Sequence, residues 1–235
     1  MAELNILGVL PARGGSKGLP GKNLREISGR PLLAWAADAI QGIPEITQSI
    51  CTTDDDRIAE IAIRCGLEVP FMRPAYLASD EALIQDVLIH ALDELDDIEY
   101  PFTHILLVQA TSPNVTKNDV REAIKLIHES GADTVIAGFK VGMHHPSLMF
   151  KLVGNNKVAW LFSDGKHMAR RQDFPEVFIR TGLLYLISTE VLRTSKSMYG
   201  ENIQSLIVDE ERAITIDNEA DFFRAQEILE KHKND

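Results

Sequence analysis

Residues 5–23 read NILGVLPARGGSKGLPGKN, an apolar run followed at once by a loop rich in glycines and cations. An uncharged run such as residues 5–10 is typical of a strand that is buried on both faces of a sheet. Ligands of open α/β sheets bind beyond the carboxyl ends of such strands, where this loop would lie. Glycines let backbone N–H groups approach an anion closely, and Arg13, Lys17 and Lys22 add positive charge. The stretch therefore predicts a phosphate-binding loop.

The charge of this stretch differs from that of the rest of the chain. The 235 residues carry a formal net charge of −11, yet the segment from Arg13 to Arg30 holds five cations and one anion, a local charge of +4. The remainder therefore carries −15, which argues against general binding of nucleic acid. Charge alone fits a solvated loop equally well, and the glycines between the cations favour an anion site.

Two common phosphate motifs do not fit the loop. A P-loop needs Gly-x-x-x-x-Gly-Lys followed by serine or threonine, but Ser16 stands five residues before Gly21, and Asn23 follows Lys22. Residues 15–18 do not match the dinucleotide fingerprint Gly-x-Gly-x-x-Gly either. The loop is therefore a third kind of phosphate site.

The order of the remaining elements predicts the fold class. Strand-like runs recur at residues 49–53, 105–108 and 183–187, and helical patterns follow Pro31, Asp54, Leu83, Thr116 and Asn218. We expect Asp54 to cap its helix, and Thr116 with Asp119 to start a helix that stops at Gly131. In the last helix, Phe222, Ala225 and Leu229 are expected to face inward. Strands that alternate with helices predict an α/β fold with a doubly wound, mainly parallel, Rossmann-like sheet. From residue 140 to residue 180 the segments are shorter. We therefore expect a single domain over residues 1–235, with residues 140–180 as a small projecting insertion.

Composition and chain ends exclude several classes of protein. No apolar run has the length of a membrane span, and the N-terminus lacks the basic region of a signal peptide. Cys51 and Cys65 show no metal or redox spacing, so we expect reduced thiols in a cytoplasmic protein without membrane contact. Cys51 and both tryptophans are expected in the core.

Four groups of residues stand out as motifs. They are residues 11–18 with Gly21-Lys22-Asn23, Arg73-Pro74 with residues 77–80 (LASD), Gln109 with Thr111-Ser112-Pro113, and residues 170–175 (RRQDFP). Together they resemble the cytidylyltransferases that activate acidic sugars, the acylneuraminate cytidylyltransferase (CMP-sialic acid synthetase) family, over nearly the whole chain. The resemblance implies a nucleotidyltransferase fold, a homodimer joined through the insertion, and dependence on Mg²⁺. It also implies transfer of CMP from CTP to an acidic nine-carbon sugar, with release of pyrophosphate.

The resemblance assigns roles to individual residues. Arg13, Lys17 and Lys22 would be the catalytic cations at the phosphates. The nucleotide would be held by Ala12, Arg13, Gly14, Asn23, Arg73, Ala78 and Ser79. Gln109 would lie on the substrates, and Asp217 would be the metal carboxylate.

Three of these assignments have simpler alternatives. The adjacent Arg170 and Arg171 suit the carboxylate of the sugar acid or a phosphate, but they also fit a solvated surface pair. Ser79 or Asp80 could simply cap the helix that begins near Leu83. Gln109 could be an ordinary polar loop residue.

The sequence departs from the family pattern at two places. Thr181-Gly182 stands where the family has Asn-Gly, and Thr215-Ile216-Asp217 stands where it has Asp-x-Asp. The first departure bears on the sugar contacts, and the second removes one of two metal-linked carboxylates. Three alternatives therefore remain open: the same reaction on legionaminic, pseudaminic or deoxyoctulosonic acid, the use of GTP, and a non-catalytic homologue that binds nucleotide sugars.

Overall fold

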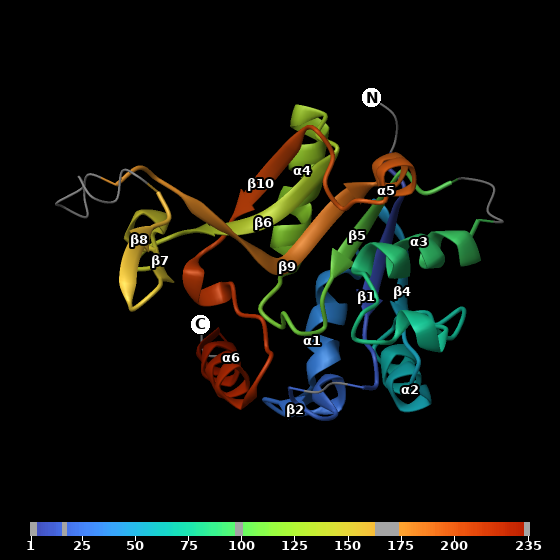
Figure 1. Cartoon of the computed structure of the whole chain (residues 1–235). Helices are drawn as coiled ribbons and strands as arrows, with labels where there is room; N and C mark the ends of the chain where they lie inside the picture. Colours follow the sequence, from blue (N-terminus) through green and yellow to red (C-terminus); the bar gives the residue numbers. More distant parts are fainter. Residues whose placement is uncertain (1–3, 16–17, 97–100, 163–173, 233–235) are drawn as a thin grey trace.

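The computed structural model describes residues 4–15, 18–96, 101–162 and 174–232. Its centre is a six-stranded sheet in the order β10-β6-β9-β5-β1-β4 (Figure 1). The strands are β1 (Ile6–Pro11), β4 (Ile46–Thr52), β5 (His104–Val108), β6 (Thr134–Lys140), β9 (Phe178–Ser188) and β10 (Ile203–Ile207). β1 runs parallel to β4 and β5, and β10 runs parallel to β6, whereas β9 is antiparallel to both of its neighbours. The predicted α/β fold with a mainly parallel sheet is confirmed.

Helices cover both faces of this sheet. They are α1 (Leu32–Ala39), α2 (Asp56–Arg64), α3 (Ile84–Glu94), α4 (Lys117–Ser130) and α5 (Thr189–Ser195), and α6 (Glu219–His232) packs separately. Successive side chains of a strand point to opposite faces. Accordingly, Ile6 and Leu10 of β1 pack with α1, α2 and α4, while Leu7 and Val9 pack with α3 and α5. No helix among the described residues is both long and apolar enough to cross a bilayer.

The helix α6 forms a third apolar cluster beside the glycine-rich loop. Phe222, Ala225 and Leu229 face inward, as the sequence predicts, and they pack with Leu19 and Ile27 from the segment after β1. The last helix of the chain thereby supports the predicted phosphate loop.

Capping residues explain where two helices begin. Thr116 and Asp119 form a complete capping box at α4, and Gly131 ends that helix with a φ of 63°. The expectation that Asp54 caps α2 was wrong by one residue, because Asp55 accepts the backbone N–H of Arg57. The carboxylate of Asp54 instead accepts the N–H of Gly14 at 2.9 Å, in the glycine-rich loop.

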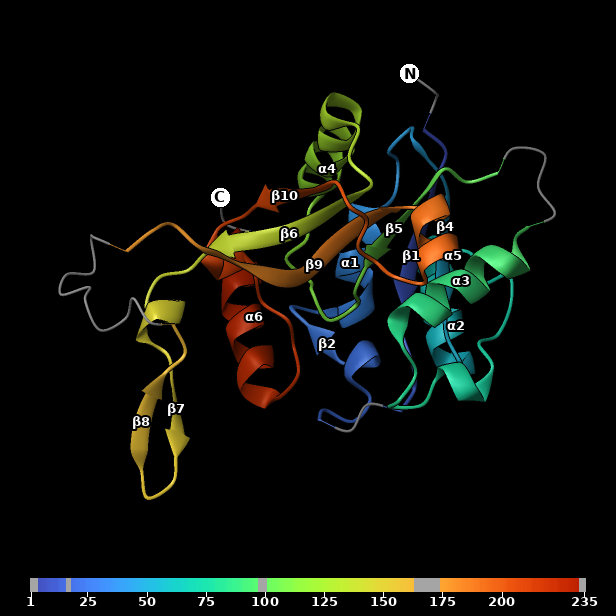
Figure 2. The same ribbon diagram turned by 45° about the horizontal axis from the view of Figure 1, so that its top comes forward.

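Two short antiparallel pairs lie outside the main sheet. β2 (Glu26–Ile27) pairs with β3 (Arg30–Pro31), and β7 (Phe150–Val153) pairs with β8 (Lys157–Trp160). The β7–β8 hairpin stands away from the sheet (Figures 1 and 2). Its apolar side chains are exposed, and Trp160 has 38% of its surface accessible. The expectation that both tryptophans lie in the core was therefore wrong for Trp160, because no second layer of the described chain covers the hairpin.

Candidate active site

A cavity of about 560 Å³ opens beyond the carboxyl ends of β1 and β5. This is the position at which open α/β sheets bind ligands. Seven of the residues singled out from the sequence line it: Arg13, Lys22, Asn23, Arg73, Ser79, Gln109 and Asp217. Ala12, Gly14 and Ala78 are chain neighbours of these residues. Lys17, Arg170 and Arg171 lie outside the described residues.

Arg13 spans the mouth of the cavity. Its Nη1 donates to the carbonyl oxygen of Ala78 at 3.3 Å, and its Nη2 contacts Oδ1 of Asp80 at 2.5 Å. The side-chain amide of Asn23, a residue that is 5% exposed, donates to the carbonyl oxygen of Arg13 at 3.0 Å. Asn23 thus fixes the backbone of the loop, while Arg13 joins that loop to residues 78–80.

Two glycines of the loop are required by close packing. A Cβ on Gly14 would lie 2.8 Å from Oδ2 of Asp55, and a Cβ on Gly18 would overlap the backbone carbonyl oxygen of Asp217. A side chain at position 18 could be accommodated only by moving backbone. Gly14 therefore lets the loop approach Asp55, and Gly18 lets it approach the segment that carries Asp217.

Lys22 and Asp217 form an ion pair in the lining of the cavity. The ammonium group of Lys22 donates to the carbonyl oxygen of Ile216 at 2.6 Å and lies 3.3 Å from Oδ1 of Asp217. The Lys22 side chain is 12% exposed, whereas that of Asp217 is 74% exposed. A mostly buried cation is thus held beside a carboxylate that is open to solvent.

Arg73 is buried in the cavity wall. Its Nε donates to Oγ1 of Thr52 at 3.1 Å, its Nη2 donates to the carbonyl oxygen of the same residue, and its backbone N–H donates to Thr53 at 2.7 Å. Burial lowers the pKa of this guanidinium, and the nearby charge of Asp54 opposes that shift. Arg73 remains charged and braces the end of β4 against the cavity.

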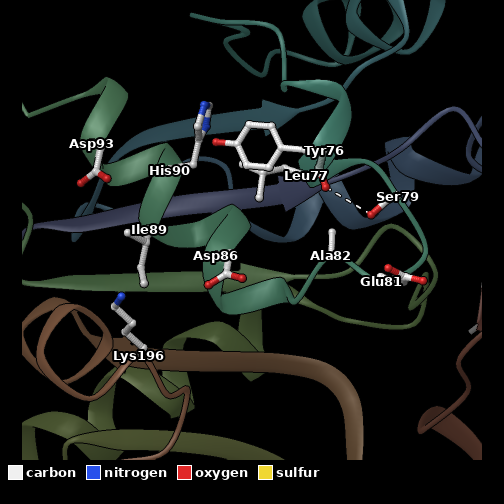
Figure 3. A pocket seen from close by; sticks show the side chains of 10 residues that line it. All are labelled: Tyr76, Leu77, Ser79, Glu81, Ala82, Asp86, Ile89, His90, Asp93 and Lys196. Carbon is white, nitrogen blue, oxygen red and sulfur yellow. Dashed lines mark hydrogen bonds between the residues drawn. The ribbon is translucent and has the colours of Figure 1, made fainter.

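Ser79 lies between this cavity and a second one of about 720 Å³ (Figure 3). Its hydroxyl donates to the carbonyl oxygen of Tyr76 at 3.2 Å. Neither Ser79 nor Asp80 caps α3, since Leu83 occupies the N-cap position without a side-chain bond. The alternative reading of these residues as helix caps is therefore wrong.

The second cavity is larger but its charge is unsuited to phosphate. Its carboxylates come from Glu81, Asp86 and Asp93, and Lys196 is the cation that faces them among the described residues (Figure 3). Carboxylates repel a triphosphate, whereas Arg13 and Lys22 attract it. The smaller cavity is therefore the better candidate for chemistry on an anionic nucleotide.

Gly182 lies close to Thr215 and to Gln109, and Gln109 lines the smaller cavity. A Cβ on Gly182 would lie 3.1 Å from Oε1 of Gln109 and 3.2 Å from Oγ1 of Thr215. Thr111 donates its hydroxyl to the same oxygen of Gln109 at 3.3 Å. Thr181, next to Gly182, has a buried hydroxyl without a partner among the described residues. Both departures from the family pattern therefore lie near Gln109.

Sequence reasoning missed several partners of the site residues. Asp54 holds Gly14, Asp80 pairs with Arg13, and the carbonyl of Ile216 holds Lys22. The close packing of Gly18 against Asp217 was also missed. Gly18 and Asp80 both belong to motifs quoted from the sequence, so their place in the site could have been predicted. The carbonyl contact of Ile216 joins residues 194 positions apart and has no sequence signal.

Known proteins resemble this chain over nearly its whole length. The family model described as Cytidylyltransferase matches residues 7–233. A CMP-N,N'-diacetyllegionaminic acid synthase of Legionella pneumophila is 28% identical over 230 residues, which cover 97% of each chain. An N-acylneuraminate cytidylyltransferase of Streptococcus agalactiae is 27% identical over 216 residues, which cover 91% of this chain and 51% of that one.

A solved structure with the same fold holds a nucleotide. The complex of CMP:2-keto-3-deoxy-manno-octonic acid synthetase with CTP superimposes with a TM-score of 0.72. The superposition covers 97% of this chain and 99% of the other, at 17% identity. It supports the fold, and the family model covers nearly the whole length. The chain belongs to the cytidylyltransferase family.

Proposed function

We propose that this protein transfers CMP from CTP to the anomeric hydroxyl of a sialic-acid-like nonulosonic acid and releases pyrophosphate. The observation that carries the proposal is the cavity at which Arg13, Lys22 and Asp217 meet. Two cations beside a glycine-rich backbone suit a triphosphate, and an exposed carboxylate suits the metal that accompanies it.

The relatives support an acidic nine-carbon sugar as the acceptor. The Legionella synthase, whose name gives N,N'-diacetyllegionaminic acid, shares its full length with this chain, whereas the streptococcal N-acylneuraminate enzyme is matched over about half of its own length. We therefore place N,N'-diacetyllegionaminic acid first among the acceptors and N-acetylneuraminic acid second. Pseudaminic acid and deoxyoctulosonic acid follow.

The residues of the loop bind the phosphates in this proposal. Arg13, Lys17 and Lys22 contact phosphate oxygens, and Asn23 keeps the loop in shape. Arg13 and Lys22 already lie at the cavity because Asp80 and Asp217 hold them there. The fixed cations need little rearrangement when the triphosphate enters, which is how positioning lowers the barrier of such reactions.

The chemical step is an in-line displacement. The anomeric oxygen of the sugar attacks the α-phosphorus, the bond from that phosphorus to the oxygen bridging to the β-phosphate breaks, and the hydroxyl proton passes to solvent. Gln109, which lines the cavity, would contact the acceptor, and Arg170 and Arg171 would bind the acceptor's carboxylate. Arg73, Ala78 and Ser79 form the wall for the nucleoside.

The side chains at Asp217 fit a magnesium ion that is bound together with CTP. Among the described residues, no three histidine, cysteine, aspartate or glutamate side chains are placed to hold a metal alone. Mg²⁺ needs few protein carboxylates, because phosphate oxygens and water complete its shell. Asp217 would supply the carboxylate and Thr215 a neutral hydroxyl. When bound, the ion would neutralise the charge on the departing pyrophosphate.

The β7–β8 hairpin supports a homodimer. Its exposed apolar side chains include Phe150, Leu152, Val158 and Trp160. A two-stranded ribbon is marginally stable alone, and an exposed apolar patch of this kind is typical of a surface that another chain covers. In a twofold dimer each hairpin would be covered by the partner subunit.

The proposal is tested by the release of pyrophosphate in the presence of Mg²⁺. CTP, GTP, ATP and UTP are each combined with the four acceptors named above. We expect CTP with one nonulosonic acid to give the highest kcat/KM. Equal rates with deoxyoctulosonic acid would exclude a nonulosonic acid as the preferred substrate, and binding without turnover for every pair would favour a non-catalytic homologue.

A further inference from the structure

Residues 213–217 connect two sides of the smaller cavity. We call this cavity the catalytic cavity, because it is where we propose that CMP transfer takes place. On one side, the carbonyl oxygen of Ile216 accepts the ammonium of Lys22, and Asp217 packs against Gly18. On the other side, the N–H of Ile216 donates to the carbonyl oxygen of Thr111 at 2.9 Å, in the loop that carries Gln109. The positions of Thr215 and Asp217 therefore depend on how firmly this segment is held.

Arg212 stands at the start of this segment and anchors it to α4. Its Nη2 forms an ion pair with Oδ2 of Asp119, and it also donates to the carbonyl oxygen of Asn114 at 3.4 Å. The Asp119 side chain is 5% exposed. A charge-assisted bond to a buried carboxylate is a strong fixed point. It stands at the start of a segment in which Ile214 and Ile216 are buried against α6.

Asp119 is shared between the helix cap and the arginine. The same Oδ2 accepts the N–H of Thr116 at 2.8 Å and its hydroxyl at 2.7 Å. The capping box of α4 is complete without Arg212, since Thr116 and Asp119 satisfy each other. The arginine therefore adds a bond that the helix itself does not need.

We infer that Arg212 and Asp119 are positioning residues for CMP transfer. Arg212 is not among the described residues that line the catalytic cavity, so it acts through the segment that follows it. It ties the Thr215–Asp217 side of the cavity to the loop from Gln109 to Thr116, so that both move as one body. The inference rests on the proposed roles of Thr215 and Asp217 at the site.

The test compares Arg212→Gln with Thr116→Ala, because both remove bonds to the same carboxylate oxygen. Arg212→Gln should lower kcat at least fivefold, with a smaller change in KM for CTP. It should also speed hydrogen exchange at the amide of Ile216 at least tenfold. Thr116→Ala removes a helix cap and should lower Tm by about 2–4 °C. Its kcat and its exchange at Ile216 should stay within twofold of the wild type.

Two further variants separate positioning from general stability. Arg212→Lys keeps a cationic donor and should recover part of the kcat lost in Arg212→Gln. Asp119→Asn combined with Arg212→Gln should lower kcat no further than the larger single effect, because the two residues act as a pair.

The exchange measurement keeps the inference separate from the proposed function, since it needs no substrate. Unchanged exchange at Ile216 in Arg212→Gln would overturn the inference whatever the activity of the wild type. Loss of kcat in Thr116→Ala and Arg212→Gln in proportion to their loss of Tm would also overturn it. A wild type without activity on any acceptor would count against the proposed function alone.

Discussion

The catalytic cavity and the β7–β8 hairpin differ in the polarity of the side chains that they bury and expose. The cavity buries polar residues such as Asn23 and Arg73, while the hairpin exposes apolar ones such as Leu152 and Trp160. Buried polar groups have to be hydrogen-bonded, and both cavity residues are. Apolar side chains that stay exposed to water contribute no hydrophobic free energy to folding.

The two regions are therefore suited to different binding partners: the cavity to an anion, and the hairpin to an apolar surface of the proposed partner subunit. The cations of the cavity, Arg13 and Lys22, are held in place by ion pairs with Asp80 and Asp217. The apolar side chains of the hairpin are exposed, and in the proposed homodimer the partner subunit would cover them.

Removal of the exposed carboxylate should affect the cavity most. Asp217→Ala should lower kcat at least a hundredfold, about 2.7 kcal/mol of transition-state stabilisation, because the proposed metal loses its only charged ligand from the described residues. The measurement is pyrophosphate release at saturating Mg²⁺ and CTP. Glu129→Ala, an exposed carboxylate at the end of α4, is the matched control and should be normal. Full activity of Asp217→Ala would remove our metal assignment.

Removal of a phosphate cation should have the next largest effect. Arg13→Ala should lower kcat/KM at least tenfold, about 1.4 kcal/mol or more, and Lys22→Ala should do the same. Asp80→Asn is the informative control, because it removes the carboxylate that faces Arg13 and leaves the guanidinium in place. If Arg13 served only to pair with Asp80, the two variants would lose equal activity.

Charges in the hairpin should change assembly rather than chemistry. Leu152→Glu combined with Val158→Glu should convert a dimer into a monomer, because carboxylates would be buried without partners at the interface. Light scattering at micromolar concentration reports the mass. Ile63→Glu introduces the same charge at an exposed apolar position of α2 and should leave the dimer intact. A wild type that is already a monomer contradicts the contrast between the two regions.

The smallest predicted effect concerns the missing second carboxylate. Thr215→Asp should lower the Mg²⁺ concentration that gives half-maximal rate severalfold, because it adds a charged oxygen ligand beside Asp217. A magnesium titration of pyrophosphate release checks this for both proteins. An unchanged titration curve would mean that position 215 does not reach the metal. Activity gained only in Thr215→Asp would favour the non-catalytic reading of the natural sequence.

The sequence was sufficient to predict the fold around the cavity. The apolar residues 5–10 indicated β1, and Thr116 with Asp119 and Gly131 marked both ends of α4. These signals are local, because capping and strand burial depend on residues that are near in the chain. Loop residues that follow strands also come together by topology alone, so Arg13 and Gln109 could be placed at one edge.

Long-range and surface features escaped prediction for physical reasons. The bond between Lys22 and Ile216 involves a backbone carbonyl, which every residue has, so no residue type signals it. Trp160 was expected in the core because large aromatic side chains are usually well buried, but burial depends on a neighbouring layer that the hairpin does not have. The capping residue of α2 was misplaced because three adjacent aspartates, Asp54, Asp55 and Asp56, can all cap a helix.

The most direct test of our account is product analysis with CTP and N,N'-diacetyllegionaminic acid in the presence of Mg²⁺. We predict equal amounts of pyrophosphate and of a CMP-linked nonulosonic acid, detected by mass spectrometry, and a rate that falls at least tenfold in Arg13→Ala. The account is contradicted if no CMP-linked sugar forms with this acceptor or with any other nonulosonic acid. It is equally contradicted if Arg13→Ala, in a folded protein, forms the product at the rate of the wild type.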